Sequence, residues 1–268
     1  MSLRVCIMGN SHVACLRQAH AAEPGRWPGL DARFLGAHKG LLLETAERDR
    51  HLVPTSPEAA EAFRTLGGIP ALPLDDFDAF VVAGCLVSFA TVANVHRHAR
   101  WLGLPSLAEA ENIAACETVL MSEAAVEEAA AELISARLGC RVVRHLGKMT
   151  ARPILLTSQP RISAIVADER RRNTQTHRTI RRKGDTEEMS RLFDECAAEA
   201  VSRSGGYFLP QPAHTRARDI LTKRAYMDGA VRLTSDGNTP QPAHDIAHAN
   251  ARYGAAVLDQ IAEALDAA

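Results

Sequence analysis

Short apolar runs that end at a glycine or a turn alternate along this chain with longer segments of helical character. The clearest run is DAFVVAG at residues 78–84, which is β-branched and apolar and stops at a glycine, as a buried parallel strand does. We expect four further strands, at residues 3–8, 31–36, 153–158 and 206–209. Strands and helices in alternation predict an α/β fold with a mostly parallel central sheet and helices on both of its faces.

Helix signals fall between these runs. The serine and proline at 56–57 supply an N-cap and a proline at the first helical position. An Ala- and Glu-rich stretch at 122–138 predicts a helix that Gly139 would end. A capping-box-like spacing at 185–188 predicts a helix that runs to about residue 202.

The composition excludes several classes of protein. The chain has 268 residues, of which 46% are hydrophobic and 24% charged, and its formal net charge is -1. These fractions argue against a disordered or a membrane protein, and the near-neutral charge argues against a dedicated nucleic-acid binder. No linker divides the chain, so we expect a single domain over residues 1–268.

The expected cellular location is inferred from the lack of a recognisable targeting signal and of closely spaced cysteines. The first ten residues have one basic side chain and an apolar run broken at Gly9, which is too short for a signal peptide. No stretch reaches the roughly 18 apolar residues of a membrane helix. The six cysteines lie far apart without a C-x-x-C pair, which favours reduced, buried thiols. We therefore expect a cytoplasmic protein.

A serine follows the first predicted strand, in the sequence Gly-Asn-Ser-His at 9–12. Ligands of open α/β sheets bind beyond the carboxyl ends of the strands. The hydroxyl of Ser11 can project into that crevice, while its backbone N–H lies at the start of a helix expected at about 12–22. Helix capping is the simpler interpretation of this serine by itself.

Asp245 and His248 lie just before a helix with apolar periodicity near the other end of the chain. A histidine can take the proton of a serine hydroxyl if a carboxylate holds its other ring nitrogen. His214 and His244 are alternative bases, but the spacing to Asp245 and the following Asn250 favour His248. Taken singly, each of these residues is more simply a surface residue at a helix start.

Together, Gly9-Asn10-Ser11 and Asp245-x-x-His248-x-Asn250 resemble the motifs of the SGNH (GDSL-type) hydrolase family. The resemblance implies a three-layer, flavodoxin-like α/β/α sandwich and ester or related acyl chemistry. It implies Ser11 as nucleophile, His248 as base and Asp245 as its partner. The architecture would cover most of the chain, whereas the motifs cover two short segments.

Two positions depart from the family pattern. Asn10 stands where the family usually has Asp; it is isosteric and can still brace the turn by hydrogen bonds. The segment Gly-Cys-Leu-Val-Ser at 84–88 stands where the family has Gly-x-Asn-Asp, so the asparagine that would donate to the oxyanion is missing. Loss of one such donor typically costs about 10²–10³ in rate. Asn94 or another polar group replaces it, or two backbone donors suffice, or catalysis is feeble.

The backbone donors would be the N–H of Ser11 and that of a glycine near a strand end. Gly36 and Gly40, in the sequence FLGAHKG, are candidates, and Gly84 is a third. The spacing does not choose between them.

Other residues are candidates for contact with the substrate. His12 and Asn250 adjoin the proposed catalytic residues, and the segment 158–160 closes a strand on the same edge. His38 and Lys39 follow the second strand and can bind an anionic group. The Arg-rich stretch at 170–183 is either a solvated loop or an anion-binding lid.

These patterns lead to one functional hypothesis and two alternatives. The leading hypothesis is a serine hydrolase that cleaves an acyl ester of a small molecule or carbohydrate. An acyltransferase with the same triad, acting on a sugar or alcohol, is the first alternative, and a catalytically silent binding protein on the same fold is the second. We expect no cofactor and no metal site, because neither His96-x-His98 nor His244-x-x-x-His248 has a third ligand at a suitable spacing. No nucleic-acid or membrane partner is expected, and the sequence carries no signal for an oligomeric state.

Overall fold

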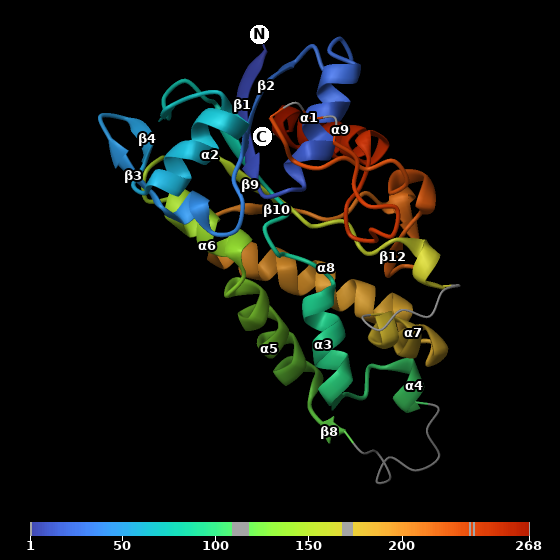
Figure 1. The fold of residues 1–268 in the computed structure, drawn as a ribbon. Coiled ribbons are helices and arrows are strands. Elements are labelled where there is room, and N and C mark those ends of the chain that lie inside the picture. The colour runs from blue at the N-terminus through green and yellow to red at the C-terminus, as the bar shows by residue number, and fades with distance from the viewer. Residues whose placement is uncertain (1, 109–117, 168–173, 236, 238, 268) are drawn as a thin grey trace.

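A five-stranded parallel sheet forms the centre of the protein (Figure 1). The computed structural model describes residues 2–108, 118–167, 174–235, 237 and 239–267. Neighbouring strands of the sheet are parallel throughout, which confirms the predicted α/β class. In spatial order the strands are β2 (Leu30–Gly36), β1 (Leu3–Gly9), β6 (Ala79–Ala83), β9 (Ile154–Thr157) and β10 (Tyr207–Leu209).

The strand order reverses between β1 and β6. The chain passes from β1 to β2 on one side of it and then to β6 on the other. In open α/β sheets a crevice forms beyond the carboxyl ends of the strands at such a point. Gly9 pairs with Ala83 at the ends of these two strands, so the turns that follow them leave the same edge of the sheet. One of these turns carries Ser11.

The two faces of the sheet belong to two apolar cores, as the alternation of side chains along a strand requires. Both cores consist of side chains withdrawn almost wholly from water. One contains Cys6, Met8, Phe80, Val82 and Leu156, and the other contains Val5, Ile7, Val81 and Leu155.

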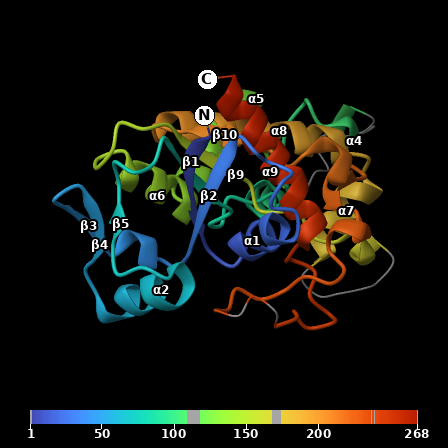
Figure 2. The same cartoon turned by 90° about the horizontal axis from the view of Figure 1, so that it is seen from above.

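Helices cover both faces and complete a three-layer α/β/α sandwich (Figure 2). Helices α1 (Val13–Ala22) and α9 (Ala251–Asp266) pack on the face of Val5 and Ile7. The other face is covered by α3 (Ala90–His98), α5 (Glu123–Ser135), α6 (Leu138–Leu146) and α8 (Thr186–Arg203). The remaining α-helices of the described residues are α2 (Pro57–Gly67), α4 (Pro105–Ala108) and α7 (Gln175–Arg182).

Two predicted helix starts form as expected. Ser56 caps α2 by accepting a hydrogen bond from the N–H of Ala59, with Pro57 at the first helical position. Ser122 caps α5 in the same way, through the N–H of Ala125. Each cap satisfies one N–H that lacks a partner within its helix.

The prediction that Gly139 ends the preceding helix is wrong. Helix α5 ends at Ser135, and Gly139 lies inside the next helix, α6. A Cβ at this position would lie 2.8 Å from the Val87 side chain and 2.9 Å from that of Leu156. The Gly139 N–H also donates to the carbonyl oxygen of Cys85 at 2.7 Å. The glycine therefore allows α6 to approach the turn that follows β6.

The helix predicted from residue 185 is present as α8, but its capping box is not. Asp185 stands at the N-cap position without a side-chain hydrogen bond to the helix. Its carboxylate instead accepts hydrogen bonds from Ser106 and contacts the ring of His96. A tertiary hydrogen-bond network has replaced the local cap.

In the part of the chain that the structure describes, three small sheets lie outside the central one, and they were not predicted. The strands β3 (Thr45–Arg48), β4 (His51–Pro54) and β5 (Leu72–Pro73) form an antiparallel sheet beside α2. Two-stranded pairs join β7 (Ala99–Arg100) to β8 (Val119–Leu120) and β11 (Arg216–Ala217) to β12 (Leu221–Thr222). These strands have two to four residues each, too few for a visible alternation.

The Arg-rich stretch is a helix where the structure describes it. Arg178, Arg181 and Arg182 lie in α7, which buries His177 and Ile180, so a loop is wrong for this part. Residues 168–173, with three further arginines, lie outside the described residues.

Within the described residues, no helix combines the length and the apolar character needed to cross a membrane. The five cysteines that the structure describes are buried and unpaired, and Cys116 lies outside the described residues.

Candidate active site

The turn after β1 presents Ser11 at the reversal point of the sheet. The Oδ1 atom of Asn10 accepts a hydrogen bond from the N–H of His12 at 3.3 Å, which braces the turn just before α1. The predicted bracing role of Asn10 is confirmed. Ser11 is only partly buried, and no described group accepts a hydrogen bond from its backbone N–H.

Asp245 organises the loop that carries His248. One carboxylate oxygen accepts hydrogen bonds from the N–H of His248 at 2.7 Å and from the N–H of Ala247 at 3.0 Å. The other oxygen lies 3.0 Å from Nδ1 of the His248 ring. The carboxylate thus fixes both the backbone and the ring of the histidine.

The structure joins these two segments into a Ser-His-Asp arrangement. Nε2 of His248 lies 2.9 Å from Oγ of Ser11, although 237 positions separate the two residues in the chain. The side chains of His248 and Asp245 are 23% and 20% exposed, so water and small molecules can reach the pair. Of the alternative bases, His214 packs against Tyr226, and it is His248 that contacts the serine.

Asp245 is ionised across the whole physiological pH range. Partial burial raises the pKa of this carboxyl, but the hydrogen bonds from the ring and backbone of His248 outweigh it and lower the pKa to about 2. A permanent negative charge therefore lies beside Nδ1 of the histidine. Such a charge favours the tautomer with its proton on Nδ1, which leaves Nε2 as the acceptor that faces the serine.

His12 packs flat against His248. The two ring centroids are 5.2 Å apart at an interplanar angle of 22°. Burial, and then the neighbouring His248, lower the pKa of His12 to about 3, so it is neutral. On its other side His12 contacts Gly84, where a Cβ would come within 2.9 Å of the ring. His12 thus acts as a packed wall for the His248 ring.

The turn after β6 has a strained backbone. Gly84, Cys85 and Leu86 have φ angles of 73°, 48° and 68°, three consecutive residues in the left-handed region. For a residue with a side chain this conformation costs about 1–2 kcal/mol. Strain of this kind concentrates at functional sites. Here it lies at the position of the motif that the sequence lacks.

The three glycines predicted as oxyanion donors differ in whether their backbone N–H groups are available to a ligand. Gly40 borders the same hollow as Ser11, and no described group accepts a hydrogen bond from its N–H. The N–H of Gly84 is occupied, because it donates to the carbonyl oxygen of Thr157 at 3.0 Å. Gly36 lies within β2, against the side chain of Leu233. Gly84 and Gly36 are therefore poor candidates, and Gly40 stays a candidate.

Asn94 and Asn250 do not take the places expected for them. Asn94 is exposed on α3 and lines two hollows that do not include Ser11. Asn250 caps α9 through Oδ1, and its Nδ2 donates to the carbonyl oxygens of Ala225 and Asp228. Its hydrogen-bonding capacity is used within the protein, so it stabilises the segment that joins His248 to α9.

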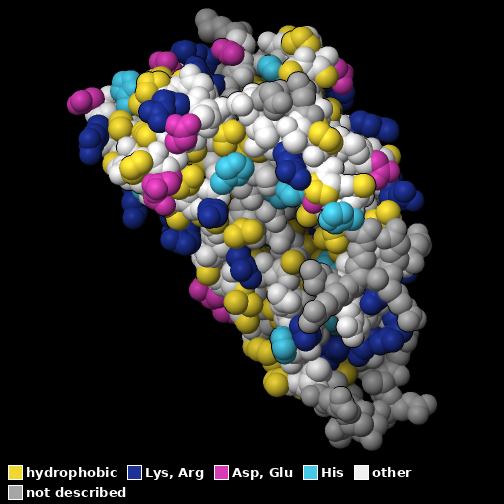
Figure 3. All heavy atoms as spheres, viewed as in Figure 1, with side chains coloured by type: hydrophobic (Ala, Val, Ile, Leu, Met, Phe, Trp, Pro, Cys, Tyr) yellow, Lys and Arg dark blue, Asp and Glu magenta, His cyan; other side chains and the backbone are white. Residues whose placement is uncertain are grey.

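A hollow of about 580 Å³ opens beside Ser11. Its wall comes from the turns after β1, β2 and β6 and from the start of α6. Figure 3 shows Lys or Arg and His side chains gathered near the middle of this face. The residues lining the hollow are Asn10, Ser11, His38, Lys39, Gly40, Leu86, Ala136, Arg137, Leu138 and Arg141.

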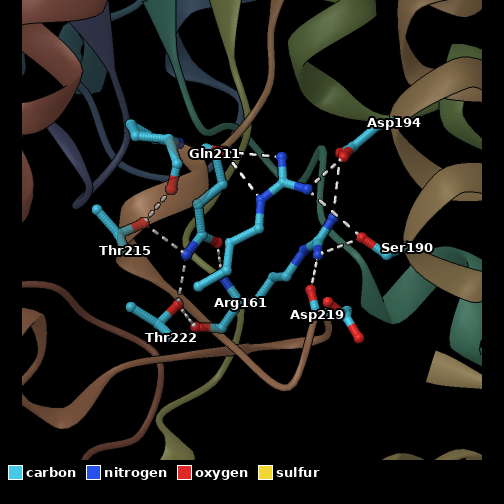
Figure 4. A network of polar contacts seen from close by, with 9 residues as sticks. Arg161, Ser190, Asp194, Gln211, Thr215, Asp219 and Thr222 are labelled. Atoms are coloured by element: carbon cyan, nitrogen blue, oxygen red, sulfur yellow. Dashed lines mark hydrogen bonds and ion pairs between the residues drawn. The ribbon is translucent and has the colours of Figure 1, made fainter. Parts of the chain in front are cut away.

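A buried arginine, Arg161, anchors the segment after β9, which contacts the loop between Asp245 and His248. The guanidinium of Arg161 donates to Ser190 at 2.7 Å, to Asp194 at 3.1 Å and to the carbonyl oxygen of Asp219 (Figure 4). Two residues on, the N–H of Ser163 donates to the carbonyl oxygen of Ile246 at 2.8 Å.

The backbone of Arg161 belongs to the same network. Its N–H donates to Oε1 of Gln211, and its carbonyl oxygen accepts from Thr222 (Figure 4). Gln211 in turn donates to Thr215 and Thr222, each at 3.0 Å. The network thus ties the segment after β9 to α8 and to the loop that begins at Gln211. Neither Arg161 nor Gln211 was predicted, since nothing in their spacing marks a buried cation.

Gly254 allows α9, the helix that follows His248, to contact α1, the helix that follows Ser11. It lies in α9 where this helix crosses α1, and a Cβ here would overlap the carbonyl oxygen of Cys15. The sequence motifs do not predict this role of Gly254. Its packing role depends on the crossing of two helices far apart in sequence.

Comparison of the chain with models of known protein families, with curated proteins and with solved structures finds no match.

Proposed function

We propose that this protein is a serine hydrolase of the SGNH type that cleaves an acyl ester of a small molecule or carbohydrate. The observation that carries the proposal is the 2.9 Å contact between Oγ of Ser11 and Nε2 of His248. This distance lies within the range of about 2.6–3.2 Å that a nucleophile and its general base need. The carboxylate of Asp245 on the other ring nitrogen completes the set.

The reaction has two halves. In the first, His248 takes the proton of the Ser11 hydroxyl while Oγ attacks the carbonyl carbon of the ester. The tetrahedral intermediate collapses, and His248 returns the proton to the departing alcohol, leaving an acyl-enzyme. In the second half, His248 takes a proton from water, the hydroxide attacks the acyl carbon, and the proton returns to Ser11 as the free acid leaves.

Backbone amides would stabilise the oxyanion of both tetrahedral intermediates. The N–H groups of Ser11 and Gly40 border one hollow, and neither has a hydrogen-bond acceptor among the described residues. The side-chain Nδ2 of Asn10 is a third donor in this hollow, because Oδ1 is the atom that accepts from His12. Together these groups would take over the role of the asparagine that the 84–88 segment lacks.

A fluorophosphonate probe tests the proposal directly. The probe reacts with an activated serine by forming a phosphorus–oxygen bond and releasing fluoride. We expect one label on the wild-type protein, located on Ser11 by mass spectrometry, and none on Ser11→Ala. The matched control is Ser106→Ala. Ser106 also hydrogen-bonds within a His–Asp group, through the carboxylate of Asp185, but far from Ser11 in the chain, so we expect this variant to be labelled like the wild type.

Ester hydrolysis supplies the second measurement. With 4-nitrophenyl acetate, we expect Ser11→Ala to lower kcat/KM by at least about 10³-fold. If Ser11→Ala hydrolysed the ester at the wild-type rate, the assignment of Ser11 as the nucleophile would be refuted. Absence of both label and hydrolysis in the wild type would favour a silent binding protein. Acyl transfer to added polyols in preference to water would indicate a transferase with the same triad.

A further inference from the structure

We infer that the substrate's acyl group carries an anionic group, a carboxylate or a phosphoryl group, that binds in the hollow beside Ser11. The inference rests on the proposed function, because it assigns a part of the ester to a place next to the nucleophile. It is drawn from the charges that line the hollow.

The lining of the hollow is basic. Lys39, Arg137 and Arg141 border it together with His38, and none of the described residues that line it is acidic. The chain as a whole has 31 basic and 32 acidic residues, so an unmixed group of basic residues is a local departure from the average. A concave wall of one charge sign concentrates the opposite charge.

These cations lack partners within the protein. Most arginines of the chain that make ion pairs do so with a near neighbour or across helices, as Arg191 and Arg203 do. Among the described residues, Lys39, Arg137 and Arg141 form no ion pair and no side-chain hydrogen bond. The Nε atom of Arg137 is buried without a hydrogen-bond partner. Charge-assisted hydrogen bonds to an anion are stronger than neutral ones, so an anion bound in the hollow would give these three side chains the partner that they lack.

The backbone adds to the positive electrostatic potential in the hollow. Helix α6 begins at Leu138 in the wall of the hollow, so the positive end of its dipole faces the same space. Lys39 is held at a φ of 52°, an uncommon conformation for a residue with a side chain. The turn after β2 and the start of α6 thus present positive charge from two walls.

The position of the base decides which part of the ester lies in the hollow. The departing alcohol must receive its proton from Nε2 of His248, so it leaves on the side of the histidine. Neither His248 nor Asp245 lines the hollow, whereas Ser11 and Gly40 do. The acyl group therefore extends away from the histidine and into the basic space. A volume of about 580 Å³ accommodates a chain of several carbons with a terminal anion.

Paired esters test the inference by turnover. The 4-nitrophenyl monoester of adipic acid carries a terminal carboxylate, and 4-nitrophenyl hexanoate is its neutral equivalent of the same length. We expect the wild type to favour the anionic ester in kcat/KM by at least about tenfold, as one charge-assisted hydrogen bond provides. In Arg137→Gln and in Arg141→Gln the preference should fall about tenfold, through KM. Arg64→Gln, on α2, is the matched control and should keep the preference.

Binding measured without turnover separates the inference from the proposed function. Calorimetry on Ser11→Ala with adipate should show binding that weakens at least about tenfold when Arg141→Gln is added. The neutral 1,6-hexanediol should not bind. Inorganic phosphate in a parallel titration distinguishes a phosphoryl group from a carboxylate as the preferred anion.

The outcomes are distinct. A missing fluorophosphonate label with retained, arginine-dependent adipate binding would refute the hydrolase and keep the anion site. A Ser11-dependent label without a preference for the anionic ester, or with a preference that both arginine variants keep, would overturn the inference alone. Absence of binding by both adipate and phosphate would overturn it as well.

Discussion

Two His–Asp pairs among the described residues have similar geometry but very different surroundings. At the sheet edge, Nδ1 of His248 lies 3.0 Å from Asp245. Between α3 and the start of α8, Nε2 of His96 lies 2.8 Å from Asp185, with both side chains at most 1% exposed. Each pair also has a serine nearby. The difference lies in which partner the serine contacts.

In the exposed pair the serine contacts the histidine, and in the buried pair it contacts the carboxylate. Ser11 faces the free ring nitrogen of His248, whereas Ser106 donates to Asp185. Nδ1 of His96 is buried without a partner. Burial lowers the pKa of His96 despite the hydrogen bond to Asp185, so this ring stays neutral. A carboxylate next to an imidazole is therefore not enough for catalysis. The second ring nitrogen must face a nucleophile that a substrate can reach.

Asp245→Asn should give the largest effect on activity. The amide can no longer hold the tautomer in which Nε2 of His248 accepts a proton, and the comparable change in a well-studied triad lowers kcat about 10⁴-fold. We expect a loss of this order, measured by ester hydrolysis. Asp185→Asn is the matched control in the buried pair. If the two substitutions reduced kcat equally per folded molecule, the functional contrast between the pairs would be refuted.

Asp185→Ala should give the largest effect on stability. It removes the partner of His96 and of both polar groups of Ser106 from a sealed site. Because the His96 ring is neutral, the cost is that of buried donors left without an acceptor, which is typically about 1–3 kcal/mol for each donor. Urea unfolding measures this change, with Asp245→Ala as the partly exposed comparison. A smaller loss for Asp185→Ala than for Asp245→Ala would contradict the proposed division of roles.

Gly254→Ala should separate nucleophile from base without touching either. The added methyl group would overlap the Cys15 carbonyl and push α9 away from α1. A misplacement of about 1 Å can cost about 10² in rate, so we expect a loss of that order in kcat. Gly25→Ala, where a Cβ meets nothing within 4 Å, is the control. A wild-type kcat in Gly254→Ala would show that the crossing does not set the geometry of the pair.

His12 should make the active region sensitive to acid. Burial lowers its pKa to about 3, whereas the unfolded chain binds a proton near the ordinary value of 6.5. Between these values the unfolded state holds the extra proton, so stability falls as the pH decreases. From pH 6.5 to 5 the loss due to His12 is about 1.6 kcal/mol, because half of the unfolded chains already carry the proton at pH 6.5. Urea unfolding of His12→Gln at both pH values should show a smaller decrease than the wild type; an equal decrease would refute this origin.

Leu86→Gly should give the smallest change. The substitution relieves the left-handed conformation at φ 68°, and the Leu86 side chain is 52% exposed, so little packing is lost. After the entropy cost of a glycine we expect a gain of at most about 1 kcal/mol in unfolding free energy. The buried pair has no such strained turn among its described residues. A clear destabilisation would show that the leucine packs more than its exposure indicates.

The sequence predicts the sheet and the triad because both depend on local patterns. The five strands are apolar runs bounded by turns, and Ser11, Asp245 and His248 lie in short motifs at predictable positions. The sequence does not predict the contacts that Asp185 and Gly139 make. Both have the local signature of a helix end, but a tertiary contact takes precedence in each case.

The hydrogen-bond network around Arg161 could not be predicted from the sequence, for a different reason. Arg161 sits alone among polar and apolar neighbours in the chain, and its partners come from α8 and from the loop around Asp219. Burial lowers its pKa to about 10, which leaves it charged and in need of those partners. Such a network has no period and no fixed spacing. It is visible only once the chain has folded.

The separation of 237 positions between Ser11 and His248 has a consequence for synthesis. At about 5–20 residues per second, a ribosome makes the serine roughly 10–50 s before it makes the histidine. During that interval the serine turn exists without a group to deprotonate it. Under the proposed function, a nascent chain is therefore unable to attack esters until the segment with Asp245 and His248 has been made and has folded.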